Sequence, residues 1–236
     1  MRGWLAVAFG FAMLALPAMA EQQESEKSKA IASLETGDYI YRGYVENLAH
    51  TLSPLASLEI GSRPQVVAVR RKGDAISLTA EFNWHEGCGL ITAHESATGS
   101  AALEYGDCGR SIDVSVESSR GFVLDGNHYD FVGNAGHYIG AAVLGGVYAD
   151  DDGRRFLFGS DGQAVFPEKK FSFELCLEQV VPPCSGYDSF DDKTNNMSYV
   201  FRRHADSLVL YKAPKGEFDP ADYAQPLVTL HRIQEK

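Results

Sequence analysis

Alternating apolar and polar positions run through the middle of the chain. From Ile76 to Trp84 every second residue is apolar, and the residues between them are polar. A period of two places the apolar side chains on one face of a strand. The pattern therefore predicts a strand over 75–85, and the same alternation predicts strands at 112–116 and 171–177.

Tight turns separate the next apolar runs. Each turn carries an Asp-Gly pair, whose glycine supplies the positive φ that short hairpins need. The pairs are Asp125-Gly126, Asp152-Gly153 and Asp161-Gly162. Further strands are expected at 199–203, 208–211 and 227–233. No helix-length periodic segment separates these runs, so the sheet should be antiparallel and up-and-down.

Helical spacing is confined to the early part of the chain. Apolar residues recur every three or four positions from Asp38 to Leu52, which predicts one amphipathic helix ending before Pro54. An extended conformation at 39–41 is the alternative. The Gly-rich apolar segment 135–148 suits either a short helix or a kinked strand.

The first twenty residues have the pattern of a signal peptide. Arg2 precedes an apolar run, and Ala18-Met19-Ala20 offers small residues at a cleavage site. A membrane anchor is less favoured because the run is shorter than the ~20 residues of a spanning helix. We therefore expect export to the periplasm or beyond the cell, with no membrane span after cleavage. The mature chain should begin with a mobile tether or frayed helix at 21–36, followed by a single domain at 37–236.

Four cysteines lie in the mature part of the chain, and an even number in an exported protein favours disulfides. Three pairings exist. Sequential pairing, Cys88 with Cys108 and Cys176 with Cys184, is preferred because each pair closes a small loop that contains its own turn residues. A zinc site would need closely spaced C-x-x-C pairs, which the sequence lacks.

Several features together resemble the lipocalin-like, calycin-type barrels. They are the Gly37-Asp38-Tyr39 start with a short helix, the run of antiparallel hairpins, and a last strand that carries Arg232. The likeness is architectural, and the opening Gly-x-Trp of that family is absent. It implies an all-β, antiparallel up-and-down barrel with one short N-terminal helix. It also implies a ligand cavity or a loop-borne protein interface at the open end.

Charge and motifs exclude several functions. The net charge is −11 with no basic stripe, which argues against nucleic acid and anionic lipid as partners. The chain has no nucleophile elbow, P-loop or dinucleotide motif, so no catalytic residue and no cofactor is predicted. No metal site is predicted either, since His85-Glu86 lacks the second histidine of a zinc helix and spacing alone does not bring His128 and His137 together. An enzyme ranks third and would require scattered Asp, Glu and His residues to meet in one cleft.

The remaining signal is a set of aromatic residues on alternating strand positions. We expect them to line a barrel cavity that holds a small, largely apolar ligand. They are Phe82, Trp84, Phe171, Phe173, Tyr199 and Phe201. The alternative is a periplasmic inhibitor or immunity factor that binds a cationic cell-envelope hydrolase, for which opposite charge would speed association.

Overall fold

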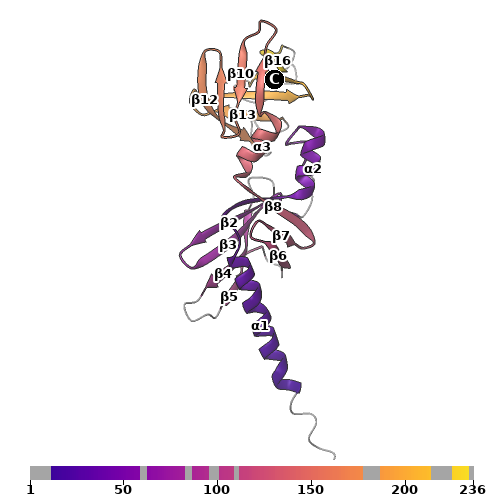
Figure 1. The fold of residues 1–236 in the computed structure, drawn as a ribbon, viewed down its shortest axis with the longest axis vertical. Coiled ribbons are helices and arrows are strands. Elements are labelled where there is room, and N and C mark those ends of the chain that lie inside the picture. The colour runs from indigo at the N-terminus through magenta and orange to yellow at the C-terminus, as the bar shows by residue number, and fades with distance from the viewer. Residues whose placement is uncertain are drawn as a thin grey trace, which may run out of the picture.

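The fold was analysed in a computed structural model. The structure describes residues 12–58, 63–82, 87–95, 101–108, 112–177, 187–213 and 225–233. Strands dominate, in two separate antiparallel sheets with three helices (Figure 1). Among the described residues, no helix is both long and apolar enough to cross a membrane.

The first sheet has eight strands in the order β5-β4-β3-β2-β1-β8-β7-β6. Its strands are β1 (Gly37–Tyr41), β2 (Val66–Lys72), β3 (Ala75–Glu81), β4 (Gly87–Glu95), β5 (Ala101–Tyr105), β6 (Val114–Ser118), β7 (Gly121–Leu124) and β8 (Asn127–Gly133). Every neighbouring pair is antiparallel. Because β8 returns to pair with β1, β5 and β6 follow one another in the chain yet form the two ends of the sheet.

Helix α1 (Ala12–Ala32) lies against β3, β4, β5 and β6. Ile31 and Leu34 are buried in the apolar cluster of the first sheet. The Arg71 guanidinium donates to the Ala32 carbonyl oxygen at 2.8 Å. The segment for which a tether or frayed helix was expected is therefore helical through Ala32, because its last apolar residues are needed to cover the sheet.

The second sheet is a closed barrel of eight strands. They are β9 (Gly146–Ala149), β10 (Arg155–Phe158), β11 (Gln163–Phe166), β12 (Lys169–Cys176), β13 (Ser189–Asp192), β14 (Met197–Arg203), β15 (Ser207–Lys212) and β16 (Val228–Arg232). Each strand pairs with the next, and β16 pairs with β9 to close the ring. The predicted all-β class, with an antiparallel up-and-down barrel and one short helix near the N-terminus, is confirmed.

The predicted strands are divided between the two sheets. The strand predicted at 75–85 begins as β3 in the first sheet, and residues 83–86 lie outside the described residues. The strand at 112–116 is β6 of the same sheet, while the one at 171–177 is β12 of the barrel. The barrel is thus built from the last part of the chain alone.

Each of the two segments for which the sequence left helix and strand open contains both a helix and a strand. Residues 39–41 are extended, in β1, and the predicted helix is the shorter α2 (Arg42–Thr51). The segment 135–148 forms α3 (Ala135–Val143) and then enters β9. Asn134 begins α3 as its N-cap, because its side chain accepts the His137 N–H at 2.8 Å.

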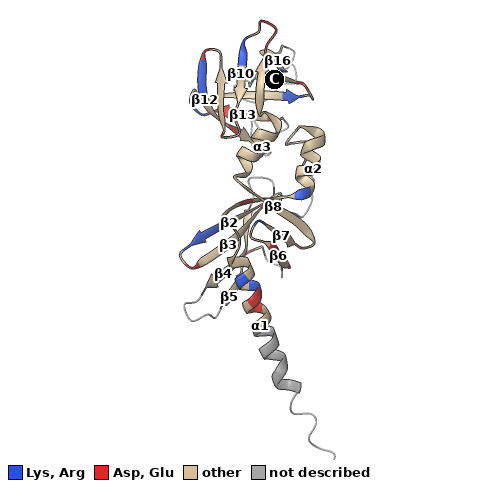
Figure 2. Cartoon of the chain, viewed as in Figure 1, with Lys and Arg blue, Asp and Glu red and all other residues tan. Residues whose placement is uncertain are grey.

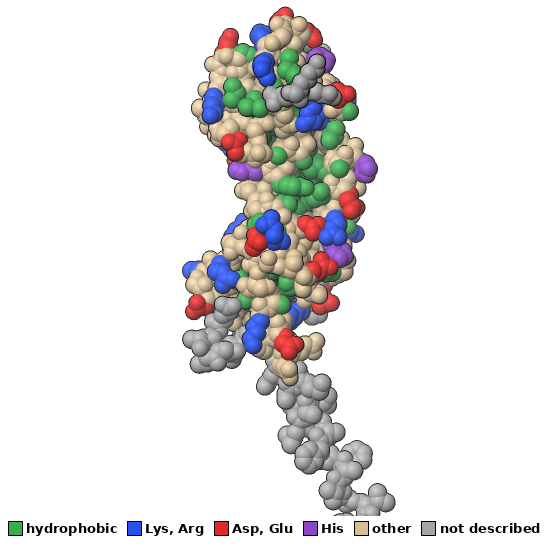
Figure 3. Space-filling view, in the orientation of Figure 1, with side chains coloured by type: hydrophobic (Ala, Val, Ile, Leu, Met, Phe, Trp, Pro, Cys, Tyr) green, Lys and Arg blue, Asp and Glu red, His purple; other side chains and the backbone are tan. Residues whose placement is uncertain are grey.

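The two sheets share an apolar core through the helices between them. One cluster of buried residues includes Ile40 of β1, Tyr44 and Leu48 of α2, Ile139 of α3 and Phe158 of the barrel. Figure 1 shows α2 and α3 between the first sheet and the barrel, and Figure 3 shows hydrophobic side chains gathered there. Packing along this cluster holds the barrel against the end of β1.

The three predicted hairpin turns are confirmed. Asp125 and Gly126 both have positive φ, at 47° and 78°, between β7 and β8. Gly153 joins β9 to β10 with φ 77°, and Gly162 joins β10 to β11 with φ 74°. At the three glycines, the absence of a Cβ avoids the strain of a positive φ.

Candidate ligand site

Aromatic rings fill the interior of the barrel. Phe190 is 0% exposed, and its ring centroid lies 5.1 Å from that of Tyr199, 5.6 Å from Phe158 and 5.9 Å from Phe173. Most of these contacts are edge-to-face, the arrangement that aromatic pairs prefer. The middle of the barrel is therefore packed core, in contrast to the open cup that the lipocalin-like resemblance implies.

Four of the six predicted ligand residues meet inside the barrel. Phe171, Phe173, Tyr199 and Phe201 belong to its core cluster and are 2–5% exposed. Phe82 is half-buried against the separate cluster of the first sheet. Trp84 lies outside the described residues. The predicted set is thus split between the two sheets.

One end of the barrel carries a cup of about 290 Å³, which we call the mouth cup. Its walls are Phe156, Phe166 and Tyr199 with the aliphatic side chains of Leu227 and Val228. Phe156 and Phe166 are in edge-to-face contact at 4.9 Å, and Leu227 is 55% exposed at the rim. The three rings themselves are only 3–9% exposed, so they form the floor of the cup below the exposed Leu227.

Lys169, at the start of β12, lies in the lining of the mouth cup. Its Nζ donates to Asp192 Oδ2 at 2.7 Å and to Tyr199 Oη at 2.8 Å. It also lies 4.6 Å from the ring centroid of Phe171 and 5.2 Å from that of Tyr199. Aromatic faces attract a cation at such distances, so the ammonium group is held by both charge and ring contacts.

Asp192 lies behind Lys169 and is 0% exposed. Besides Lys169 it accepts the backbone N–H groups of Thr194 and Asn195 at 3.0 and 2.9 Å, and the Asn195 amide at 2.8 Å. Burial alone would raise the pKa of Asp192, but these hydrogen bonds hold it below its ordinary value. For Lys169, burial works to lower the pKa, and its bonds to Asp192 and Tyr199 raise it overall. The ion pair therefore stays charged at neutral pH.

Sequence reasoning missed Lys169, although a signal was present. Lys169 has the same parity along β12 as Phe171, Phe173 and Leu175, and those three side chains point into the barrel. A period-two strand places residues of equal parity on one face. A lysine in line with an apolar face is unusual unless its charge has a partner. Asp192 is that partner.

A second, polar cleft of about 450 Å³ lies between α3 and the barrel. It brings together His137, Asp161 and Glu174, the kind of convergence that the enzyme hypothesis required. Lys193 Nζ, however, lies 3.0 Å from Glu174, so this carboxylate already has a cation. The cleft has few apolar walls for the predicted type of ligand.

Among the described residues, His128, Asp130 and His137 form no group with metal-ligand spacing. His128 pairs with Glu117 at 3.3 Å, and Asp130 pairs with Arg42 at 2.8 Å, both in the first sheet, whereas His137 is in α3. In the described part of the chain, the one group with metal-ligand spacing is Cys88, Asp107 and Cys108. Both of its sulfur atoms are used in a disulfide.

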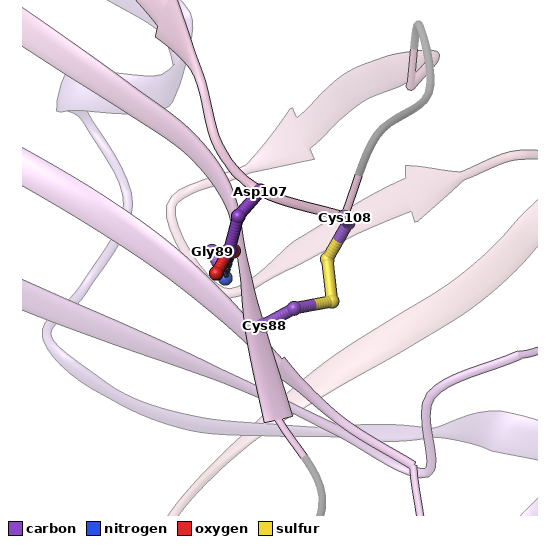
Figure 4. Close-up of a disulfide and its surroundings, with 4 residues drawn as sticks. All are labelled: Cys88, Gly89, Asp107 and Cys108. Carbon is purple, nitrogen blue, oxygen red and sulfur yellow. Dashed lines mark hydrogen bonds between the residues drawn. A yellow bond between two sulfur atoms is a disulfide. The ribbon is translucent and has the colours of Figure 1, made fainter.

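The Cys88–Cys108 disulfide confirms one predicted pairing (Figure 4). Asp107 beside it accepts the Gly89 backbone N–H at 2.7 Å, which ties the segment after β5 to β4. Cys176 is also disulfide-bonded, and Cys184, its predicted partner, lies outside the described residues. A half-open apolar groove of about 340 Å³ adjoins the first disulfide and includes Phe82 in its lining.

A scan against protein-family models, a search of curated proteins and a search of solved structures each found no match.

Proposed function

We propose that the protein binds a small, largely apolar ligand at the mouth cup of its closed barrel. The observation that carries this proposal is a cup in which three aromatic and two aliphatic side chains lie beside a few charged groups, Lys169 among them. Small-molecule sites typically combine apolar walls with a few placed polar groups. The cup is near the lower end of the usual size range, which favours a small ligand.

The proposed site lies at one end of the barrel, whereas the sequence predicted a cavity inside it. Packed rings such as Phe158 and Phe190 support the walls from below, so the cup is rigid before the ligand arrives. Each 100 Å² of apolar surface removed from water contributes about 2.5 kcal/mol, before the cost of ordering the ligand. A preformed wall keeps that cost low.

We place this activity outside the cytoplasm, in the periplasm or the secreted fraction. The signal-peptide pattern of residues 1–20 and the Cys88–Cys108 disulfide support this location, because disulfides persist in oxidising compartments. The alternative function, an inhibitor or immunity factor against a cationic envelope hydrolase, remains a prediction from the sequence.

Methyl NMR spectra test the proposed site. A neutral apolar probe, 1-octanol, should cause saturable shifts of the Leu227 and Val228 methyl signals. Leu227→Asp should weaken binding because it puts a charge on the rim without disturbing buried packing. Leu157→Asp is the matched control, since Leu157 is 40% exposed and lies outside the mouth cup.

Two results would contradict the proposal. One is the lack of any saturable shift of the Leu227 and Val228 methyl signals. The other is a change confined to the fluorescence of Trp84, which follows Phe82 by two positions. That second result would place the ligand away from the mouth cup.

A further inference from the structure

Lys169 has a hydrogen-bond donor to spare at the mouth cup. An ammonium group carries three N–H bonds. Among the described residues, Asp192 and Tyr199 accept two of them. The Lys169 side chain is 28% exposed and forms part of the cup lining. The third N–H is therefore available to an acceptor that enters the cup.

Tyr199 offers a second donor at the same place. Its hydroxyl oxygen accepts the Lys169 proton at 2.8 Å, so its own O–H is not used in that bond. In the part of the chain that the structure describes, this is the only side-chain hydrogen bond of Tyr199. Tyr199 belongs to the cup lining together with Lys169. Two adjacent donor groups, the Lys169 ammonium and the Tyr199 hydroxyl, therefore belong to one lining.

A second basic residue lies in the lining of the cup. Arg154 also lines the cup, and it is held by Asp150 at 2.6 Å and by Asp152 at 3.2 Å while 58% of its side chain stays exposed. Among the described residues of the lining, Glu168 is the one that is acidic. Figure 2 shows basic residues on β10 and β12 of the barrel, the strands that begin beside the cup.

Asp192 occupies the buried side of Lys169. It is fully buried behind Lys169, and backbone and side-chain donors from Thr194 and Asn195 already bind it. Those donors stay in place when an anion arrives on the solvent side of Lys169. The ammonium group would then bridge two carboxylates, one buried and one from the ligand.

We propose, on the basis of the proposed function, that the ligand is a small monocarboxylate whose head group accepts the third N–H of Lys169 and the O–H of Tyr199. Its apolar body lies against Phe156, Phe166 and Val228. Such charge-assisted hydrogen bonds are the stronger kind, so the carboxylate should bind at least about tenfold more tightly than a neutral analogue.

A matched ligand pair tests the head group. Octanoate and 1-octanol share one hydrocarbon chain, and both are titrated into the full chain while the Leu227 and Val228 methyl signals are followed. Wild type should prefer octanoate by about tenfold or more. Lys169→Met should lose that preference and keep its affinity for octanol. Lys170→Met is the matched control, because Lys170 is exposed on β12 and lies outside the cup lining.

A second variant guards against a folding defect. Tyr199→Phe removes only a hydroxyl, so it should stay folded and lose part of the octanoate preference. Equal affinity for octanol and octanoate in wild type would overturn the head-group inference and leave the proposed function standing. A preference that survives in Lys169→Met would overturn the role of Lys169. Failure of both probes to shift the methyl signals would refute the inference and the proposed function together.

Discussion

At the scale of single residues, the centre of the barrel depends on Phe190. Four aromatic rings surround it, those of Phe158, Phe173, Tyr199 and Phe201. Removing its ring leaves a cavity that the packed neighbouring side chains fill only in part. The lost van der Waals contacts add to the lost burial of apolar surface. The same packing that excludes a ligand from the interior makes this position sensitive.

Phe190→Ala should therefore lower the free energy of unfolding by about 3–5 kcal/mol. Leu157→Ala, on the exposed outer side of β10, should change it by less than about 0.5 kcal/mol. Urea denaturation followed by circular dichroism measures both. Similar losses in the two variants would show that the interior is not close-packed.

Asp192 sets a second residue-scale expectation, for acid stability. The pKa of Asp192 is lower in the folded protein than its ordinary value of 3.8, so the folded state gains stability from the ionised form. That stability is present above pH 3.8 and is lost as the pH falls through the folded-state pKa. Asp192→Asn should be less stable at neutral pH and should lose less on acidification, as measured by thermal unfolding across pH.

Asp206→Asn serves as the control for this acid series, because Asp206 is exposed in the turn between β14 and β15. It should follow the wild-type curve. If Asp192→Asn showed the same acid dependence as wild type, the ion pair with Lys169 would not contribute to stability.

At the scale of elements, the backbone conformation at a glycine decides whether its replacement by alanine stabilises or destabilises the protein. Gly126 has φ 78° and open space around an added Cβ, so Gly126→Ala meets only backbone strain. It should destabilise the protein by about 1 kcal/mol. Gly136 lies in α3, where an added Cβ makes an ordinary contact at 3.5 Å with Asn134, and Gly136→Ala should stabilise by about 0.5–1 kcal/mol. Thermal unfolding of the pair measures both signs, and equal signs would contradict the prediction.

Local sequence patterns predicted the positions of strands and turns better than they predicted which strands pair. The period-two runs identified the inner faces of β3 and β12, and the Asp-Gly pairs identified hairpins such as β7–β8. The division into two sheets depends on β1 pairing with β8, whose paired residues are 88 to 95 positions apart, and no local signal fixes that choice. The mouth cup was missed for the same reason, because Lys169 meets Asp192 only after β12 pairs with β13.

At the scale of the whole molecule, the shared cluster should couple the two sheets. Ile40 of β1 and Val66 of β2, two central strands of the first sheet, pack in the same cluster as the barrel interior, together with Tyr44 and Leu48 of α2. Unfolding of the first sheet would expose this surface of the barrel as well. We therefore expect one cooperative transition.

Two probes separate the sheets experimentally. Trp84, the only tryptophan after the predicted leader, reports on the first part of the chain, and the Leu227 and Val228 methyl signals report on the barrel. Their denaturation midpoints should coincide, and Leu48→Ala should shift both downward together. Two separate midpoints in wild type would mean that the sheets unfold independently.

The position of α1 has a consequence for the handling of this chain in solution. β5 and β6 end the first sheet, and a strand at the edge of a sheet presents unpaired backbone groups to other chains. α1 lies against both strands, and its buried residues Ser28, Ile31 and Ala32 all follow the predicted cleavage site after Ala20. A chain that starts at Glu21 should therefore resist aggregation, whereas one trimmed to Glu35 should self-associate, with light scattering rising with its concentration.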